Sequence, residues 1–152
     1  MELLLAPFEA LEQSELGLSI RNAHLLYPIA NVTHVICVII FFALVASMDM
    51  AVLRRTPEEA KATIRRVRPF AFIAFFGVVG AGAVMFTAEA SALVKNPAFL
   101  AKVTAIVVAG LNLMMFSKAF AAGRLWVART SALLSMFVWI FAAAAGRGIA
   151  YL

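Results

Sequence analysis

Four long apolar runs dominate the chain, and each is close to the length of a membrane-spanning helix. They cover about residues 24–48, 69–94, 98–117 and 130–151. A helix needs about 20 apolar residues to cross the hydrocarbon of a bilayer. The pattern therefore predicts an all-α fold, an integral membrane four-helix bundle that forms a single membrane domain over residues 1–152.

The start of the chain has a different pattern from the four runs. Glu9, Glu12 and Glu15 interrupt its apolar residues, and no basic segment precedes them, unlike in a signal peptide. Apolar and acidic positions fall on different helical sides, which predicts an N-terminal amphipathic surface helix over about residues 3–20. Its acidic face is unsuited to the anionic cytoplasmic leaflet, so we expect it on the outer side of the membrane.

The segments between the runs carry most of the positive charge. The first, DMAVLRRTPEEAKATIRRVRP, is predicted to be a polar loop in which TPEE resembles the start of a short helix. This loop and the joint between the third and fourth runs hold nine of the thirteen Lys and Arg residues. Because basic loops stay in the cytoplasm, we expect a multi-pass protein of the bacterial inner membrane with both termini periplasmic.

The composition agrees with a membrane protein. The chain is 64% hydrophobic and 14% charged, whereas about a quarter of the residues of a soluble domain are charged. The net charge of +5 is explained by the basic loops, so we expect the lipid bilayer and no nucleic acid as partner. A lone cysteine, Cys37, excludes an internal disulfide and a cysteine-based metal site within one chain.

Small residues recur at helix-packing spacing, as in Gly77 with Ala81, Ala105 with Ala109, and Ala142 with Gly146. Such positions let helices approach closely in lipid, where apolar burial alone does not drive association. They favour a compact bundle. They also suit a homo-oligomer or a subunit that packs against a larger membrane complex.

Ionisable residues inside the apolar runs are the main functional signal. Each costs about 2.5–3.5 kcal/mol at the centre of a spanning helix, so it normally has a partner or a task. The stretch NVTHVICVII places His34 in the first run, and Glu89, Lys102 and Arg147 lie in the later ones. We expect the last three to share one hydrated outer cavity, with at least two of them in contact. Their polar neighbours are His24, Asn31, Asp49 and Asn112.

Helical spacing suggests how these residues face one another. Tyr27, Asn31 and His34 fall on one stripe of the first run, and Lys102 and Asn112 fall on another in the third. If the stripes face each other, His34 forms the floor of a polar cavity and Asn112 can approach it. A neutral His34 could ligate haem iron, relay a proton, or bond across helices. His24 and His34 lie on one helix and cannot clamp one iron from both sides, so a bis-histidine site needs a second chain.

The segment from Leu11 to Leu53, together with NPAFLAKVTAIVVAGLNLMMF, resembles a family of uncharacterised bacterial four-helix membrane proteins. That resemblance covers about residues 11–118. The matching positions are Ser19-Ile20-Arg21, Leu26-Tyr27-Pro28, His34, Asp49, Asn96-Pro97-Ala98-Phe99, Lys102 and Asn112. The family often has a histidine five residues after the asparagine. Ser117 stands there in this chain, which removes any ligand role at that position.

The layout is also distantly similar to HemJ-type protoporphyrinogen oxidases and to the membrane domain of copper-resistance D proteins. HemJ-type proteins have four helices, a haem-associated histidine on the first and a lysine on the third, and His34 and Lys102 fall at comparable places. The resemblance implies a haem-binding bundle. The chain lacks the tryptophan- and histidine-rich flanks of HemJ-type helices, so their specific reaction is not carried over.

Two hypotheses of function follow. In the first, the protein binds haem b or a quinone and exchanges electrons with a periplasmic or membrane redox partner. His34 is then the axial ligand of the haem iron, and Lys102, Arg147 and Arg21 neutralise propionates or bind a quinone carbonyl. Further candidate cofactor contacts are Asn112, Tyr27, Asn31 and His24. In the second, the protein is a non-catalytic accessory subunit of a larger membrane complex or homo-oligomer. No catalytic residue is assigned in either.

Overall fold

The computed structural model describes residues 2–151, with side chains placed from residue 5 onward, and every regular element in that range is an α-helix. Two short helices, α1 (Glu2–Glu12) and α2 (Glu15–Asn22), precede four long ones. The long helices are α3 (Leu26–Arg54), α4 (Pro57–Leu93), α5 (Pro97–Ala121) and α6 (Leu125–Gly148). All four are long and apolar enough to cross a membrane, which confirms the predicted all-α fold with four spans.

The segment between the first two spans is helical, so the predicted polar loop is wrong. Only Arg55 and Thr56 join α3 to α4. The Thr56 hydroxyl accepts a hydrogen bond from the Glu59 N–H, and the Glu59 carboxylate accepts one from the Thr56 N–H. This reciprocal cap satisfies free N–H groups at the helix start and so begins α4 well before Pro69, which the helix accommodates internally. α3 and α4 therefore continue as helices past the ends of the predicted apolar runs, near residues 48 and 69.

The length of α4 sets how far the first hairpin extends. With 37 residues at 1.5 Å each, α4 is roughly 55 Å long, against about 30 Å of hydrocarbon in a bilayer. About three turns at its start therefore project beyond the hydrocarbon. Those turns carry Lys61, Arg65, Arg66 and Arg68, the positive charges that the sequence placed in a loop.

The second hairpin follows the predicted pattern more closely. α5 and α6 overlap the apolar runs expected over 98–117 and 130–151, with the start of α6 earlier than predicted. The Asn96 side chain caps α5 by accepting hydrogen bonds from the Ala98 and Phe99 N–H groups. Gly123 has φ +69°, a conformation that glycine adopts without steric cost, and it lets the chain reverse into α6.

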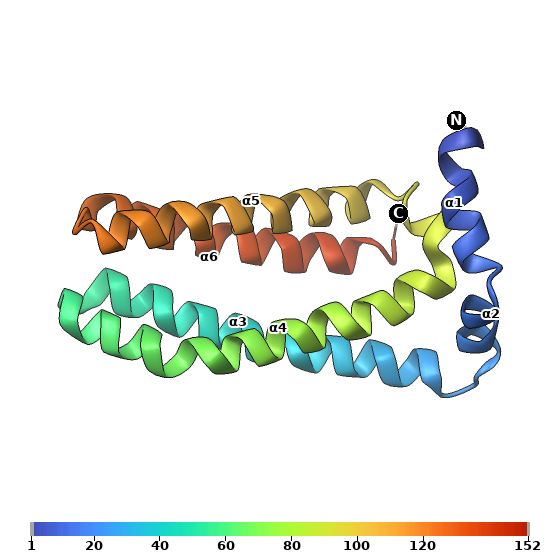
Figure 1. Cartoon of the computed structure of the whole chain (residues 1–152), viewed down its shortest axis with the longest axis horizontal. Helices are drawn as coiled ribbons and strands as arrows, with labels where there is room; N and C mark the ends of the chain where they lie inside the picture. The colour runs from blue at the N-terminus through green and yellow to red at the C-terminus, as the bar shows by residue number, and fades with distance from the viewer. Residues whose placement is uncertain (1, 152) are drawn as a thin grey trace.

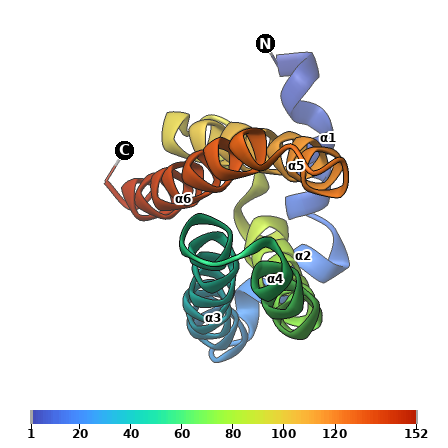
Figure 2. The ribbon, with the colours of Figure 1, turned by 90° about the vertical axis from the view of Figure 1, so that its left-hand side faces the viewer.

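The two hairpins lie along each other and meet mainly through α3 and α6 (Figure 1). Seen end-on, α3 pairs with α4, and α5 pairs with α6 (Figure 2). We call the part of the bundle near the α3–α4 and α5–α6 connections the turn half, and the part near α1 and α2 the N-terminal half. In the turn half the helices meet through a core of small buried residues: Ala51, Val52, Ala60, Ala128 and Ala132.

The small residues that the sequence singled out lie at helix contacts. Ala105, Ala109 and Ala142 are buried in a second core cluster between α5 and α6. A Cβ added to Gly77 would lie 2.6 Å from the sulfur of Cys37, so α3 and α4 approach at a distance that only glycine allows. These contacts confirm that the small residues serve packing, and Cys37 is the small side chain that fills this one.

The predicted surface helix is two helices rather than one. α1 and α2 are separated at Gln13 and Ser14, and the Ser14 hydroxyl caps α2 by accepting from the Gly17 N–H. α1 lies across the end of the bundle (Figure 1) and packs on α4, where the rings of Phe8 and Phe86 meet edge to face at 6.2 Å. A helix across the spans is consistent with one that lies in the plane of the membrane surface.

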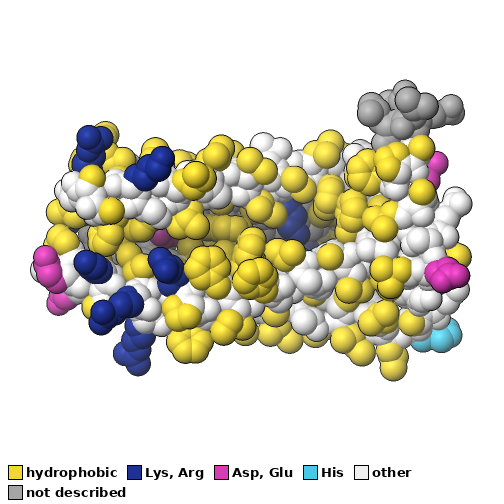
Figure 3. Space-filling view, in the orientation of Figure 1, with side chains coloured by type: hydrophobic (Ala, Val, Ile, Leu, Met, Phe, Trp, Pro, Cys, Tyr) yellow, Lys and Arg dark blue, Asp and Glu magenta, His cyan; other side chains and the backbone are white. Residues whose placement is uncertain are grey.

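The outer surface is apolar along the spans and charged at the ends (Figure 3). Large hydrophobic side chains such as Ile73, Phe76 and Phe137 are mostly exposed. Lys and Arg side chains gather where α3 meets α4 and α5 meets α6. An apolar surface of this extent needs lipid around it, so the chain is a multi-pass membrane protein.

Candidate functional site

His34 is half-buried on α3 and turned toward the other helices. Its Nδ1 lies 2.9 Å from the carbonyl oxygen of Val78 on α4. A carbonyl only accepts hydrogen bonds, so Nδ1 carries the proton in this contact. In a neutral ring Nε2 is then left with a free electron pair. This arrangement agrees with the expectation that a neutral His34 faces the bundle interior.

Lys102 meets the second nitrogen of His34. The Lys102 Nζ on α5 is 3.4 Å from Nε2, a long hydrogen bond in which the ammonium donates to the free electron pair. The contact joins the two hairpins, because His34 belongs to the first and Lys102 to the second. The sequence put these residues on separate stripes, and the structure brings them together.

Two glycines make room for this pair. A Cβ added to Gly82 on α4 would lie 3.3 Å from Cε1 of His34, and one added to Gly146 on α6 would lie 3.4 Å from Nζ of Lys102. The imidazole and the ammonium therefore rest directly against helix backbones. Sequence reasoning noted Gly146 only as a packing residue and missed Gly82, since a glycine within an apolar run carries no sign of what lies against it.

A second polar contact lies further toward the N-terminal half. The Tyr27 hydroxyl donates to the Glu89 carboxylate at 3.0 Å. Tyr27 precedes His34 by seven residues, about 10 Å along α3 and on nearly the same face. Glu89 has φ −139° and ψ 32°, so α4 is kinked there. The kink turns the end of α4 toward α1 and α2.

The N-terminal helices are fastened to α4 beside this kink. Arg21 donates to the carbonyl oxygen of Ala88 at 2.6 Å and forms an ion pair with Glu12. Glu12 in turn accepts hydrogen bonds from the hydroxyl and the N–H of Ser91. The Ser91 hydroxyl, joined by the Ser91 N–H and Arg21, lowers the pKa of Glu12 below its usual value despite partial burial. We call these four residues, Glu12, Arg21, Ala88 and Ser91, the N-terminal clasp.

The predicted cavity shared by three charged residues is not formed as expected. No hydrogen bond or ion pair joins any two of Glu89, Lys102 and Arg147, all of which the structure describes. Glu89 instead pairs with Tyr27, and Lys102 with His34. The guanidinium of Arg147 lies over the ring of Tyr151, 5.7 Å from its centre. Each of the three residues contacts a different partner, so the expected contact among them is wrong.

Asn112 lies in the turn half and is engaged away from His34. Its side-chain N–H donates to the Ser131 carbonyl at 2.9 Å, and its Oδ1 accepts from the Ser131 hydroxyl at 2.7 Å. Asn112 and Ser131 are buried between α5 and α6, and Asp49 is buried on α3. The expectation that Asn112 approaches His34 is therefore wrong. Asn112 follows Lys102 by ten residues on α5, which is about 80° short of three full helical turns. The side chain of Asn112 is therefore rotated relative to that of Lys102, away from α3 and toward α6.

Other candidates lie apart from the histidine. Asn31 and His24 are exposed, Arg21 is held in the N-terminal clasp, and Tyr27 is bonded to Glu89. The structure thus concentrates the candidate site on His34 and Lys102, with Gly82, Gly146 and the Val78 carbonyl around them. In the described part of the chain, no three His, Cys, Asp or Glu side chains lie close enough to hold a metal ion alone.

Comparisons of the chain with protein-family models, with characterised proteins and with solved structures find no match. The case for function therefore depends on the geometry of the His34–Lys102 pair and on the membrane setting of the four spans.

Proposed function

We propose that the protein is a small membrane redox protein that binds haem b, with His34 as the axial ligand. The observation that carries the proposal is the hydrogen bond from His34 Nδ1 to the Val78 carbonyl. Histidines that bind metals commonly donate their second ring N–H to a carbonyl or carboxylate, which fixes the tautomer and orients the ligating nitrogen. The distant similarity to HemJ-type proteins points to the same residue.

The residues around His34 fit this group. Nε2 is the acceptor nitrogen of the ring, and its partner Lys102 is a cation that would turn from Nε2 to a propionate when iron binds there. Gly82 and Gly146 let the imidazole and the ammonium lie directly against helix backbones, which positions the pair. Haem b supplies a one-electron carrier when bound, and the protein supplies the ligand, the charge and the apolar surroundings. Arg147 lies over the Tyr151 ring and Arg21 is committed to the N-terminal clasp, so Arg147 would have to leave that ring to serve as a second cation.

A quinone is the second candidate for the same position. Lys102 donates and His34 accepts, and their nitrogens are 3.4 Å apart. A quinone carbonyl needs a donor, and a quinol hydroxyl needs an acceptor, so this pair is complementary to both redox states of a quinone. The apolar surface of the spans would admit such a lipophilic ligand from the bilayer.

The membrane orientation completes the proposal. Nine of the thirteen basic residues lie at the turn half or in the helical turns next to it. By the positive-inside bias this end is cytoplasmic, and the termini with the N-terminal clasp are periplasmic in the bacterial inner membrane. A redox partner would then meet the site from the periplasmic side or within the membrane.

The test is the absorption spectrum of protein purified in mild detergent from cells supplied with a haem precursor. We expect a Soret band that is lost in His34→Ala and kept in Asn31→Ala, a control on the same helix with an exposed side chain. Circular dichroism should show that both variants keep their helices. A colourless protein whose organic extract contains quinone, lost in His34→Ala, would favour the second candidate.

A preparation with neither cofactor would contradict both. If that protein purified stably with another membrane protein, whose assembly failed in a deletion strain, the accessory-subunit hypothesis would replace them. If His34→Gln also kept the stability of the wild type, His34 would serve only as a bond between helices.

A further inference from the structure

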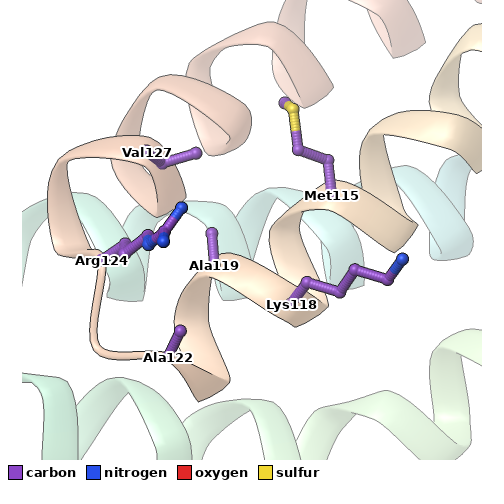
Figure 4. A pocket seen from close by; sticks show the side chains of 6 residues that line it. All are labelled: Met115, Lys118, Ala119, Ala122, Arg124 and Val127. Carbon is purple, nitrogen blue, oxygen red and sulfur yellow. The ribbon is translucent and has the colours of Figure 1, made fainter.

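A hollow of about 300 Å³ lies where α5 ends and α6 begins, in the turn half and apart from the His34 site. Its lining residues are Met115, Lys118, Ala119, Ala122, Arg124 and Val127 (Figure 4). Two are basic and none of them is acidic. The Arg124 side chain reaches back toward Ala119 and Val127, whereas the Lys118 side chain extends away from Arg124 (Figure 4). Arg124 therefore points into an otherwise apolar hollow, and Lys118 lines it from the other side.

Neither cation has a partner charge within the described chain. The ion pair found among the described residues is that of Arg21 with Glu12, at the other end of the bundle. Lys118 and Arg124 are both exposed and lie only six residues apart across a tight turn. Two unpaired cations that line one hollow create a positive potential there, which attracts an anion from the surroundings.

The neighbouring tryptophan indicates the depth at which the hollow opens. Trp126 follows Arg124 by two residues and is 77% exposed. Exposed tryptophans of membrane proteins sit preferentially at the level of the lipid headgroups. From there, exposed apolar residues such as Leu111 and Met114 continue along α5 toward the hydrocarbon. A ligand with an anionic group at this depth and an apolar chain attached to it would find cations for the first and an apolar surface for the second.

We propose that this hollow binds an anionic phospholipid of the leaflet at the turn half. The phosphate contacts Arg124, the flexible Lys118 side chain turns toward it on binding, and the first part of an acyl chain lies against Met115 and Val127. The volume is at the lower end of the roughly 300–1,000 Å³ typical of small-molecule sites, which suits one headgroup rather than a whole lipid. Charge complementarity selects anionic over zwitterionic lipids, and the site does not depend on the redox function proposed above.

The proposal is tested by native mass spectrometry of the whole protein in detergent, with added phosphatidylglycerol or phosphatidylcholine of the same acyl chains. We expect the wild type to retain phosphatidylglycerol in preference. Replacing both cations, Lys118→Gln with Arg124→Gln, should lower that retention about tenfold, because a solvent-exposed ion pair with the phosphate is lost at each. Ala122→Phe fills the hollow without changing the charge and should lower it as well.

The matched control is Lys61→Gln with Arg65→Gln, which removes the same charge from α4 in the same half of the molecule. It should retain the lipid like the wild type. An equal loss in this control would show general attraction to a basic end and would overturn the site. Displacement by millimolar inorganic phosphate alone would show that the acyl part contributes nothing, which also overturns it. Circular dichroism excludes unfolding as the cause of any loss.

Discussion

The two halves of the bundle use polar residues in opposite ways. In the turn half, Asn112 and Ser131 satisfy each other within one helix pair, and alanines fill the surrounding contacts. In the N-terminal half, His34 and Lys102 connect different hairpins, and glycines leave space against them. Apart from the buried Asp49 on α3, the turn half has the features of a structural core, whereas the N-terminal half holds two ionisable side chains in contact across the hairpins.

This difference separates stability from function. A buried amide–hydroxyl pair holds two helices at fixed register, and small side chains let their backbones approach. A contact between an imidazole and an ammonium does not stabilise the bundle in this way, because placing ionisable groups within the hydrocarbon of a membrane costs free energy. Substitutions in the turn half should therefore act on folding, and those at His34 should act on the site.

The largest effect is expected from crowding the turn half. Ala128 is fully buried in the cluster with Ala51 and Ala132, so Ala128→Leu inserts a large side chain where helices touch. It should lower the free energy of unfolding by about 1–3 kcal/mol, the usual cost of overpacking, as measured by thermal or denaturant unfolding in detergent. Ala143→Leu is the control, since Ala143 is exposed on the same helix. Equal stabilities of the two variants would contradict a packed core at Ala128.

A smaller loss is expected from breaking the Asn112–Ser131 pair. Asn112→Leu leaves the Ser131 hydroxyl and carbonyl without this partner in a buried position. Hydrogen bonds between membrane helices contribute about 0.6 kcal/mol on average and about 1.7 at most, so the loss should fall in that range. Asn31→Leu, at an exposed site, should leave the same unfolding measurement unchanged or slightly raised. A larger loss at Asn31 would mean that the N-terminal half also carries structural polar bonds.

A local effect without loss of fold is expected at Gly82. In Gly82→Ala the new methyl group lies 3.3 Å from His34, so the ring must move by a few tenths of an ångström. The free energy of unfolding should stay within about 1 kcal/mol of the wild type, since alanine also favours the helix. Nitrogen NMR of the His34 ring should nevertheless report altered hydrogen bonding. Gly80→Ala is the control, because nothing lies within 4 Å of its added Cβ. Identical His34 signals in both variants would exclude the close contact.

The smallest effect should be the pH dependence of the N-terminal clasp. Since folding lowers the pKa of Glu12, its carboxylate stabilises the docking of α1 and α2 above the unfolded pKa of about 4.3. That contribution is lost as the pH falls through the lowered folded value. Hydrogen-exchange protection factors of α1 and α2 should therefore fall only below the unfolded pKa of about 4.3, and should already be low at neutral pH in Glu12→Gln. Glu9→Gln, at an exposed site of α1, should behave like the wild type. Matching losses in both variants would remove the special role of Glu12.

The sequence alone was enough to predict four spans, because each apolar run matches the thickness of a bilayer. It also drew attention to His34 and Lys102, since ionisable residues at that depth are rare. Their contact depends on how one hairpin rotates against the other, and no local pattern encodes that rotation. The contact of Asn112 was missed for the same reason. Its angular position on α5 differs from that of Lys102, so it faces α6 and not His34. Glu12 and Ser91 are 79 residues apart, so their bond had no local signal.

The capping box at Thr56 shows a different kind of miss. The motif was visible in the sequence, but the polar residues around it suggested a loop with a short helix. Polar residues in a membrane protein do not imply an irregular chain, because a helix that leaves the hydrocarbon can continue in water. Here the hydrogen bonds between Thr56 and Glu59 decide where the helix starts.

The two-residue connection between α3 and α4 has a consequence for how the topology is mapped. Six Lys and Arg residues lie between Arg54 and Arg68, so this segment looks like an ideal target for trypsin. A protease must bind several residues in extended form, however, and only Arg55 and Thr56 lie outside a helix. Resistance of intact cells or inverted vesicles to digestion would therefore report the rigidity of a helical stalk, not the side of the membrane on which it lies. Small thiol reagents, which need no extended chain, are the appropriate probes for this end of the protein.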